Sequence, residues 1–282
     1  MITKVHLVTP TDAAREVGLV PDRERGSGFL LQVNQTDQSY VDLDDPTVLE
    51  FDYIQRMADA IDAYDTTNRP LRVIHIGGAG MTLPRYVAAT RPRSPQIVLE
   101  PDEALTAYVR EHLPLPPRSG IKVRGVNGRD GIAAMRPDYA DIVILDAFDG
   151  ARVPADLVTT EFFERVADVL VDDGMFLLNL ADRAPFAYLC RVLAGLGTRF
   201  TTMLMSAEPA TLKGRRFGNV LVCASQVGLP HRQLAQKAAG SAFPYRVLTD
   251  AMVRRTFAAT DAFTDTDSAM SPEPPGGKTF FS

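Results

Sequence analysis

Two aspartates three residues apart, Asp146 and Asp149, follow a near-continuous apolar run over residues 140–145. Such a run is typical of a strand that is buried on both faces of a parallel sheet. An acid at the end of this strand either caps a helix or faces a ligand, because open α/β sheets bind ligands at the carboxyl ends of their strands. The second acid favours the functional interpretation. We therefore take both aspartates as candidate site residues.

Glycines crowd the turn after an earlier apolar run, residues 73–76. Gly77, Gly78 and Gly80 lie in this turn, and a helix-compatible segment follows from residue 83 to 89. Glycine suits a sharp strand-to-helix turn because it tolerates positive φ and lets a ligand approach the backbone. The main-chain N–H groups of the turn then lie at a helix N-terminus, which attracts anionic or electron-rich groups of a nucleotide. We predict that these three glycines contact a cofactor.

Three further residues follow the next two predicted strands. Glu100 ends the second strand, roughly 20 residues past the glycines, where an acid accepts hydrogen bonds from ribose hydroxyls. Asp130 and Gly131 follow the third strand, where an aspartate is placed to hold an adenine amine. Each residue alone is compatible with an ordinary turn. Together with the glycine turn, they predict an adenosine pocket.

The glycine spacing does not favour a dinucleotide. A G-x-G-x-x-G pattern would begin at Gly78, but Leu83 occupies its third glycine position. We find no residue set suited to hydride transfer. A mononucleoside such as S-adenosylmethionine fits better, because it needs no pyrophosphate cradle.

The elements that must position these residues alternate between strand and helix along the chain. This alternation predicts a doubly wound, Rossmann-like α/β fold with helices on both faces of a parallel sheet. The last two predicted strands have no helix between them and are expected to pair antiparallel, which makes a mixed sheet of seven strands. The strands are expected at residues 72–76, 96–100, 121–126, 140–146, 174–180, 200–205 and 217–224, and the helices at 83–89, 103–112, 128–135, 160–171 and 184–196.

Three domains or segments are expected. Residues 1–70 form an N-terminal part: an irregular lead-in to about residue 28, a β-hairpin (29–33 and 39–41) and a helix over 48–63 capped by residues 44–47. Residues 71–228 form the nucleoside-binding domain. Residues 229–282 supply one or two helices and a tail rich in Pro, Gly and Ser, draped or disordered from residue 265.

Composition restricts the function class. The 282 residues are 45% hydrophobic, enough for a sizeable core, and the net charge of −5 argues against a nucleic-acid partner. No run is long and apolar enough to span a membrane, and the amino terminus has no signal-peptide pattern. Cys190 and Cys223 lie in apolar surroundings and are expected to be reduced. We predict a cytoplasmic protein with neither a membrane nor a nucleic-acid partner.

Several of these motifs resemble the spermidine synthase (polyamine aminopropyltransferase) family, with its class I methyltransferase-type fold. The resemblance covers roughly residues 29–224. It rests on the segments Ile-Gly-Gly-Ala-Gly (76–80), Val-Leu-Glu-Pro-Asp (98–102), Gly-Arg-Asp-Gly (128–131), Asp-Ile-Val-Ile-Leu-Asp-Ala-Phe-Asp (141–149) and Leu-Val-Thr-Thr-Glu-Phe-Phe (157–163), and on the hairpin Val-Asn-Gln-Thr-Asp-Gln (33–38).

The resemblance implies a role for each site residue. Asp146 would orient and deprotonate an attacking amine, and Asp149 would hold the acceptor. Gln38 would line the cofactor, Glu100 would bind the ribose and Asp130 the adenine amine. The co-substrate would be decarboxylated S-adenosylmethionine or S-adenosylmethionine, used without a metal, and the partner a small-molecule amine or other nucleophile. The family also implies a homodimer built through the N-terminal part.

One departure from the family pattern leaves the reaction open. Gly80 stands where the family carries an aspartate that holds the ammonium end of the aminopropyl group, and Asn34 and Gln35 replace an Asp-Gly pair in the hairpin. Aminopropyl transfer to an amine is the preferred function. An S-adenosylmethionine-dependent methyltransferase is the first alternative, since Gly80 removes a repulsion against the methionine carboxylate. A non-catalytic adenosyl-nucleoside binding protein is the second.

Overall fold

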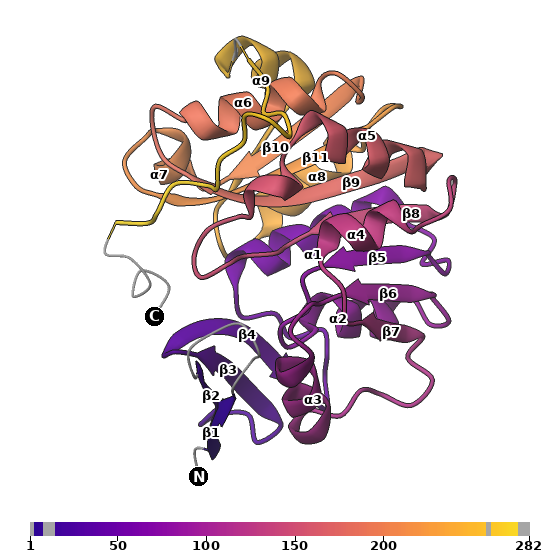
Figure 1. Ribbon diagram of the computed structural model, residues 1–282, viewed down its shortest axis with the longest axis vertical. Coiled ribbons are helices and arrows are strands. Elements are labelled where there is room, and N and C mark those ends of the chain that lie inside the picture. The colour runs from indigo at the N-terminus through magenta and orange to yellow at the C-terminus, as the bar shows by residue number, and fades with distance from the viewer. Residues whose placement is uncertain (1–2, 8–14, 258–260, 276–282) are drawn as a thin grey trace.

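A central eight-stranded sheet organises the computed structural model, which describes residues 3–7, 15–257 and 261–275. Its strand order is β12-β10-β11-β9-β8-β5-β6-β7 (Figure 1). The strands from β7 to β9 are parallel, whereas β11, β10 and β12 pair antiparallel. The bounds are β5 Val73–Ile76, β6 Gln96–Leu99, β7 Ile121–Arg124, β8 Ala140–Leu145, β9 Leu170–Asp182, β10 Thr202–Ala207, β11 Gly218–Ser225 and β12 Arg246–Leu248.

The sheet confirms the predicted doubly wound, mixed α/β fold, but the strand count of seven was wrong. The eighth strand, β12, has only three residues and pairs with the edge of β10. A segment this short carries too little alternation to be read as a strand. The antiparallel pairing of the last two predicted strands is confirmed.

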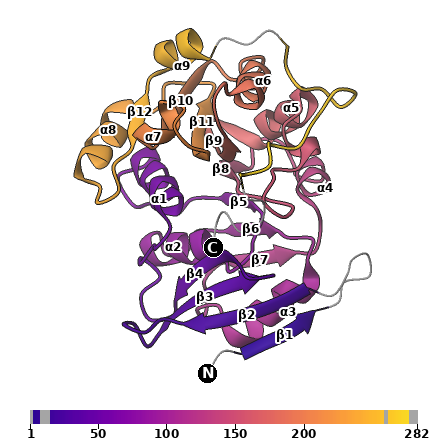
Figure 2. The same ribbon diagram turned by 90° about the vertical axis from the view of Figure 1, so that its left-hand side faces the viewer.

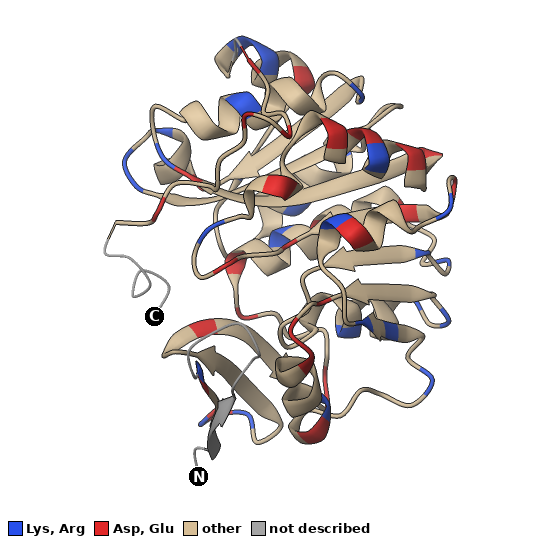
Figure 3. Cartoon of the chain, in the orientation of Figure 1, with Lys and Arg blue, Asp and Glu red and all other residues tan. Residues whose placement is uncertain are grey.

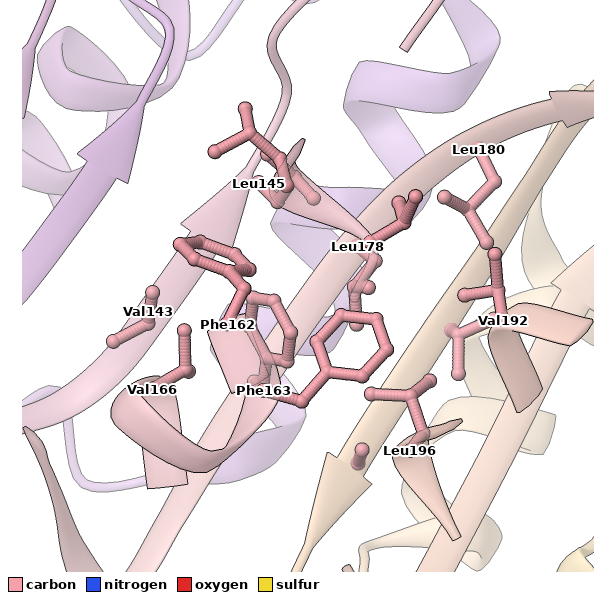
Figure 4. Close-up of a cluster of buried hydrophobic side chains, with 14 of the residues drawn as sticks. Val143, Leu145, Phe162, Phe163, Val166, Leu178, Leu180, Val192 and Leu196 are labelled. Atoms are coloured by element: carbon pink, nitrogen blue, oxygen red, sulfur yellow. The ribbon is translucent and has the colours of Figure 1, made fainter. Parts of the chain in front are cut away.

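Helices cover both faces of the sheet, as Figures 1 and 2 show. One face packs against α1, α2 and α8, and the other against α4, α5, α6 and α9. Figure 4 shows Val143 and Leu145 of β8 against the aromatic side chains of α5. The bounds are α1 Asp52–Tyr64, α2 Thr82–Thr90, α3 Glu103–His112, α4 Gly128–Ala133, α5 Thr160–Val169, α6 Ala187–Leu196, α7 Pro209–Leu212, α8 His231–Gly240 and α9 Asp250–Thr256, with a 3-10 turn η1 at Ala155–Leu157.

The predicted N-terminal hairpin is confirmed as β3 and β4, but the expected irregular lead-in was wrong, because two further strands extend the hairpin to a four-stranded antiparallel sheet. Its strands are β1 Thr3–Leu7, β2 Arg15–Pro21, β3 Gly28–Val33 and β4 Thr36–Asp42. The alternating apolar residues Val17 and Leu19 of β2 are buried, and charged neighbours hid this short alternation. This sheet packs with Met81 and the apolar side of α3 in one cluster. It therefore meets the glycine turn directly.

The first helix begins later than predicted. Asp45 accepts hydrogen bonds from the backbone and hydroxyl groups of Thr47, which closes a local turn, and α1 begins at Asp52. Short polar side chains that bond to nearby backbone compete with helix formation in this way. The helix consequently places Tyr53 in its first turn.

The C-terminal part contains two helices, α8 and α9, as expected, followed by a draped segment. In that segment Phe263 is buried, and the guanidinium of Arg191 lies 4.0 Å from its ring centre. Residues 276–282 of the predicted tail lie outside the described residues. Both cysteines are free; Cys223 is buried and Cys190 partly buried.

Two further sequence predictions concern the surface charge and membrane-spanning segments. Figure 3 shows acidic and basic residues interspersed over the chain. Within the described part of the chain, no helix combines the length and apolar character that a membrane crossing requires.

Candidate active site

The glycine turn between β5 and α2 is a point where three parts of the molecule touch. Gly77 has φ +95°, and a Cβ there would lie 2.3 Å from the carbonyl oxygen of Asp146. A Cβ on Gly80 would lie 2.7 Å from the Cβ of Ser39 on β4, whose hydroxyl accepts a hydrogen bond from the Gly80 N–H (3.0 Å). Any residue larger than glycine must therefore displace β8 or β4. The close packing explains both glycines without a ligand.

Glu100 follows β6 and binds the glycine turn. One carboxylate oxygen accepts the backbone N–H of Gly78 at 2.9 Å, and the other accepts that of Asp102 at 2.9 Å. The first oxygen, Oε2, also accepts the Ala79 N–H at 3.4 Å, whereas Oε1 has one donor among the described residues and so keeps acceptor capacity for a hydroxyl in this partly buried side chain. Glu100 thus lies beside the turn, as the adenosine-pocket prediction requires. Its role toward ribose stays a prediction.

Asp130 and Gly131 lie at the start of α4. The side chain of Asn127, the N-cap residue, accepts the Asp130 N–H (2.8 Å) and donates to the Asp130 carboxylate (2.8 Å). A Cβ on Gly131 would lie 2.5 Å from a methyl of Leu99, so helix-to-sheet packing alone accounts for this glycine. The exposed Asp130 carboxylate is held in place by Asn127. Contact of either residue with a nucleoside stays a prediction.

Gln38 lies on β4 next to the serine that binds the glycine turn. The register between β3 and β4 shifts here: Ser39 pairs with Leu31 and Asp37 with Gln32, which leaves Gln38 as the extra residue of a bulge. Bulges re-aim side chains and recur next to active sites. The structure therefore brings Gln38 to the neighbourhood of Gly80, while its contact with a cofactor stays a prediction.

Asp146 ends β8 beside β9. Asn179 of β9 donates a hydrogen bond to its Oδ1 (2.9 Å), and Asn219 of β11 donates in turn to Asn179 (3.0 Å). Burial raises the pKa of Asp146 to about 6, although the Asn179 hydrogen bond opposes the rise. Burial, together with the carboxylates of Asp146 and Asp52, also raises the pKa of Tyr53 well above 10. A carboxyl group with this pKa is suited to accept a proton at neutral pH.

Asp149 differs from Asp146 in its surroundings. It is exposed on a tight turn that its backbone closes with Arg152, through hydrogen bonds of 2.8 and 3.2 Å. Gly150 adopts φ +64° at the tip of this turn. The two predicted acids thus follow the same strand, one partly buried and one on the surface. An acceptor-binding role for Asp149 stays a prediction.

Sequence reasoning gave no site role to four residues that connect to Asp146 directly or through one another: Asn179, Asn219, Tyr53 and Arg56. Asn179 is 1% exposed within the otherwise apolar run of residues 175–181. A buried amide is costly unless it has a hydrogen-bond partner, so an asparagine in an apolar run was the available signal. Arg56 is also buried, and it donates to the backbone oxygens of Ser206 and Asn219. In the sequence, Arg56 is one polar residue within a predicted helix, and nothing there distinguishes it from the others.

No protein-family model matches the chain, but it is similar to known proteins in sequence and in structure. A polyamine aminopropyltransferase of Chromobacterium violaceum is 26% identical over 147 residues, or 52% of this chain and 55% of the relative. The chain thus spans about half the length of the curated relatives it matches. A crystal structure of a probable spermidine synthase from Corynebacterium glutamicum covers 89% of this chain and 93% of its own, with 27% identity and a TM-score of 0.83. Human methyltransferase-like protein 13, solved with SAH, shares the fold (TM-score 0.54, 20% identity, 77% of this chain and 96% of that one).

Proposed function

From this relationship to the spermidine synthase family, which confirms the resemblance predicted from the motifs, we propose that the protein is an aminopropyltransferase. It would transfer the aminopropyl group of decarboxylated S-adenosylmethionine to a small-molecule amine. The observation that carries this proposal is the partly buried Asp146, oriented by Asn179, one strand away from the glycine turn. The predicted domain boundaries at residues 70 and 228, the homodimer, the cytoplasmic location and the metal-free reaction remain predictions.

The step asked of the site is a substitution at carbon. The neutral acceptor nitrogen forms a bond to the aminopropyl carbon next to the sulfonium, and the C–S bond breaks with its electron pair going to sulfur. The products are a neutral thioether nucleoside and an ammonium, whose proton passes to the Asp146 carboxylate. An amine attacks only when it is neutral, so a carboxylate in reach that takes the proton accelerates this step. Asp149 would bind the acceptor from the surface.

The nucleoside would lie along the glycine turn, with Glu100 at the ribose and Asp130 at the adenine amine. The N–H groups of residues 77–81 already bond to protein acceptors, so the nucleoside would lie against the glycine backbone, where no Cβ stands in the way, beside the Glu100 side chain that is fixed to the turn. Gln38 would close the pocket from the N-terminal sheet, which the Ser39–Gly80 hydrogen bond attaches to the turn.

An S-adenosylmethionine-dependent methyltransferase is the alternative that one observation favours. Gly80 carries no acid, and Ser39 and Val41 fill the space that a side chain at residue 80 would need. Without this acid, the turn lacks an anchor for an aminopropyl ammonium and does not repel the carboxylate of intact S-adenosylmethionine.

Calorimetric titration with three nucleosides tests the proposal: decarboxylated S-adenosylmethionine, S-adenosylmethionine and methylthioadenosine. We expect tighter binding of the decarboxylated form than of the intact one, followed by turnover with a panel of amines. Tighter binding of intact S-adenosylmethionine would instead support the methyltransferase alternative. Binding of none of the three would overturn the nucleoside site, and binding without turnover by any donor would support the non-catalytic alternative.

A further inference from the structure

Three polar side chains form a row across the carboxyl edge of the sheet. Asn219 of β11 donates to Asn179 of β9, and Asn179 donates to Asp146 after β8. Antiparallel pairing places Leu221 opposite Asn179, and Asn219, two residues before Leu221, lies on the same face of the sheet. Parallel pairing places Leu145 opposite Leu178, so the next residues, Asp146 and Asn179, are also neighbours. The middle member, Asn179, is buried. The row is therefore buried at its centre and partly exposed at its two ends, Asp146 and Asn219.

The row has a fixed direction. An ionised carboxylate only accepts hydrogen bonds, so Asn179 must turn its NH₂ group toward Asp146. Its carbonyl oxygen then points to Asn219 and requires a donor, which the Asn219 NH₂ supplies. Reversing Asn179 would place its oxygen against the carboxylate of Asp146 and its NH₂ against the NH₂ of Asn219. The amide of Asn219 thus determines which group of Asn179 faces Asp146.

The backbone of Asn219 is also held. Arg56 donates to the carbonyl oxygens of Asn219 (3.4 Å) and Ser206 (3.1 Å) and pairs with Asp52 at 3.2 Å. The same helix turn carries Tyr53, whose pKa responds to the Asp146 charge. Arg56 therefore connects the end of the row to the first turn of α1.

The elements near β8 and the helix α1 carry several charged and titratable groups. They are Asp52, Tyr53 and Arg56 on α1, Glu100 after β6, Asp149 on its own loop, Asp182 at the end of β9, and Glu208 and Arg216 beside β10 and β11. Arg216 pairs with Glu208, and Asp182 accepts the backbone N–H groups of Arg183 and Leu189. Of the side chains named, the one that donates a hydrogen bond to Asp146 is Asn179.

We propose that Asn219 and Asn179 are positioning residues that hold Oδ1 of Asp146 through a directional amide relay and leave Oδ2 to the acceptor amine. The relay keeps the carboxylate ionised and aimed although it is partly buried. Its use in amine deprotonation rests on the proposed aminopropyl transfer. The relay itself does not, because the orientation of the amides is a property of the unliganded protein.

The test reverses the relay with Asn219→Asp, which is nearly isosteric and replaces the donor by an oxygen. Asn179 then lies between two carboxylates and can turn its NH₂ group to only one of them, so Asp146 loses its donor whenever the amide turns toward residue 219. The midpoint of the Asp146 titration, followed by NMR of ¹³C-carboxyl-labelled aspartate, should rise by about one pH unit or more. In a turnover assay, the acid limb of kcat should move upward by the same amount, with the nucleoside Kd unchanged.

A second pair of variants separates the relay from simple charge repulsion. In an Asn179→Leu background there is no amide to turn, so Asn219→Asp acts only through space and should shift the Asp146 midpoint by less than half as much. Asn219→Ala adds no charge, removes the donor, and should raise the midpoint by a few tenths of a pH unit. Equal shifts in the two backgrounds, or no shift in Asn219→Ala, would overturn the relay. Because the titration needs no substrate, a result for the relay stands whichever donor the protein uses.

Discussion

The two halves of the candidate site are built in different ways. The glycine-turn half, formed by Gly77–Gly80, Glu100 and Asp130, is held mainly through main-chain N–H groups: Glu100 accepts those of Gly78, Ala79 and Asp102, and the Asn127 side chain accepts that of Asp130. The relay half, formed by Asp146, Asn179 and Asn219, is held by side chains from three strands. Backbone groups keep their geometry when a side chain changes, whereas the relay depends on each member. The relay half should therefore be the more sensitive to single substitutions.

Asp146→Asn should have the largest effect on activity. An amide cannot take the amine proton, and loss of a positioned base lowers rates by about 10²–10⁴-fold. Steady-state kinetics should show this fall in kcat, with little change in nucleoside Kd measured by calorimetry. Asp172→Asn is the matched control, because Asp172 is exposed near the amino end of the same β9 strand that supplies Asn179. A variant at residue 146 that keeps more than a tenth of kcat would remove Asp146 from its catalytic role.

The Asp146 carboxylate should also make the free energy of unfolding depend on pH. Its folded pKa, about 6, lies above the ordinary value of 3.8, so the folded state binds the proton more tightly than the unfolded state does. The stabilisation from this group is complete below pH 3.8 and is lost as the pH rises to about 6, up to about 3 kcal/mol. Urea unfolding from pH 4 to 7 should show Asp146→Asn gaining stability relative to the wild type across this window. A difference that stays constant with pH would mean that Asp146 is not buried as an ionised group.

At the glycine turn, the free energy of unfolding should depend on side-chain volume at residues 80 and 39. Gly80→Ala places a methyl group within 2.7 Å of the Ser39 Cβ, and overpacking of this kind costs about 1–3 kcal/mol. Ser39→Gly should itself be destabilising, since it removes the acceptor of the Gly80 N–H. The double variant should cost less than the sum of the two, because the missing hydroxymethyl group makes room for the new methyl. Additive free energies of unfolding would show that β4 does not limit residue 80.

The same difference between the halves explains what the sequence could reveal. Gly77, Glu100 and Asp146 follow strands at recognisable turns, so local pattern was enough to bring them to one edge of the sheet. Asn179 and Asn219 are 40 residues apart and meet only through the antiparallel register of β9 and β11. That register is decided by packing across the whole sheet and has no local signature.

The N-terminal part shows the same limit. The strands β3 and β4 were predicted from the alternation around their turn, whereas β2 was missed. Its Val17 and Leu19 are buried in a cluster with α3 and Met81, which lie far away in the sequence. The bulge at Gln38 depends likewise on the partner strand, which a single-strand pattern does not contain.

Glu100→Gln should have a smaller effect, on nucleoside affinity. The glutamine oxygen can accept from Gly78 or from Asp102, but its NH₂ group then faces the other N–H. The variant loses one charge-assisted hydrogen bond in a partly buried position and one acceptor for a ribose hydroxyl. Nucleoside binding should therefore weaken about tenfold, or by about 1.4 kcal/mol. Calorimetry with methylthioadenosine measures this loss without requiring turnover, and kcat at saturating donor should change little.

Asp130→Asn provides the contrast within the same half and the smallest expected effect. Its carboxylate is exposed, and an asparagine oxygen can still accept from Asn127 and from an adenine amine. The nucleoside Kd should therefore rise only about two- to threefold, in line with the small energies of exposed polar contacts. A loss at Asp130 as large as that at Glu100 would mean that adenine, rather than ribose, supplies most of the binding energy. The glycine-turn half would then bind the nucleoside mainly at its exposed edge, and the turn itself would serve chiefly to pack β4 against β5.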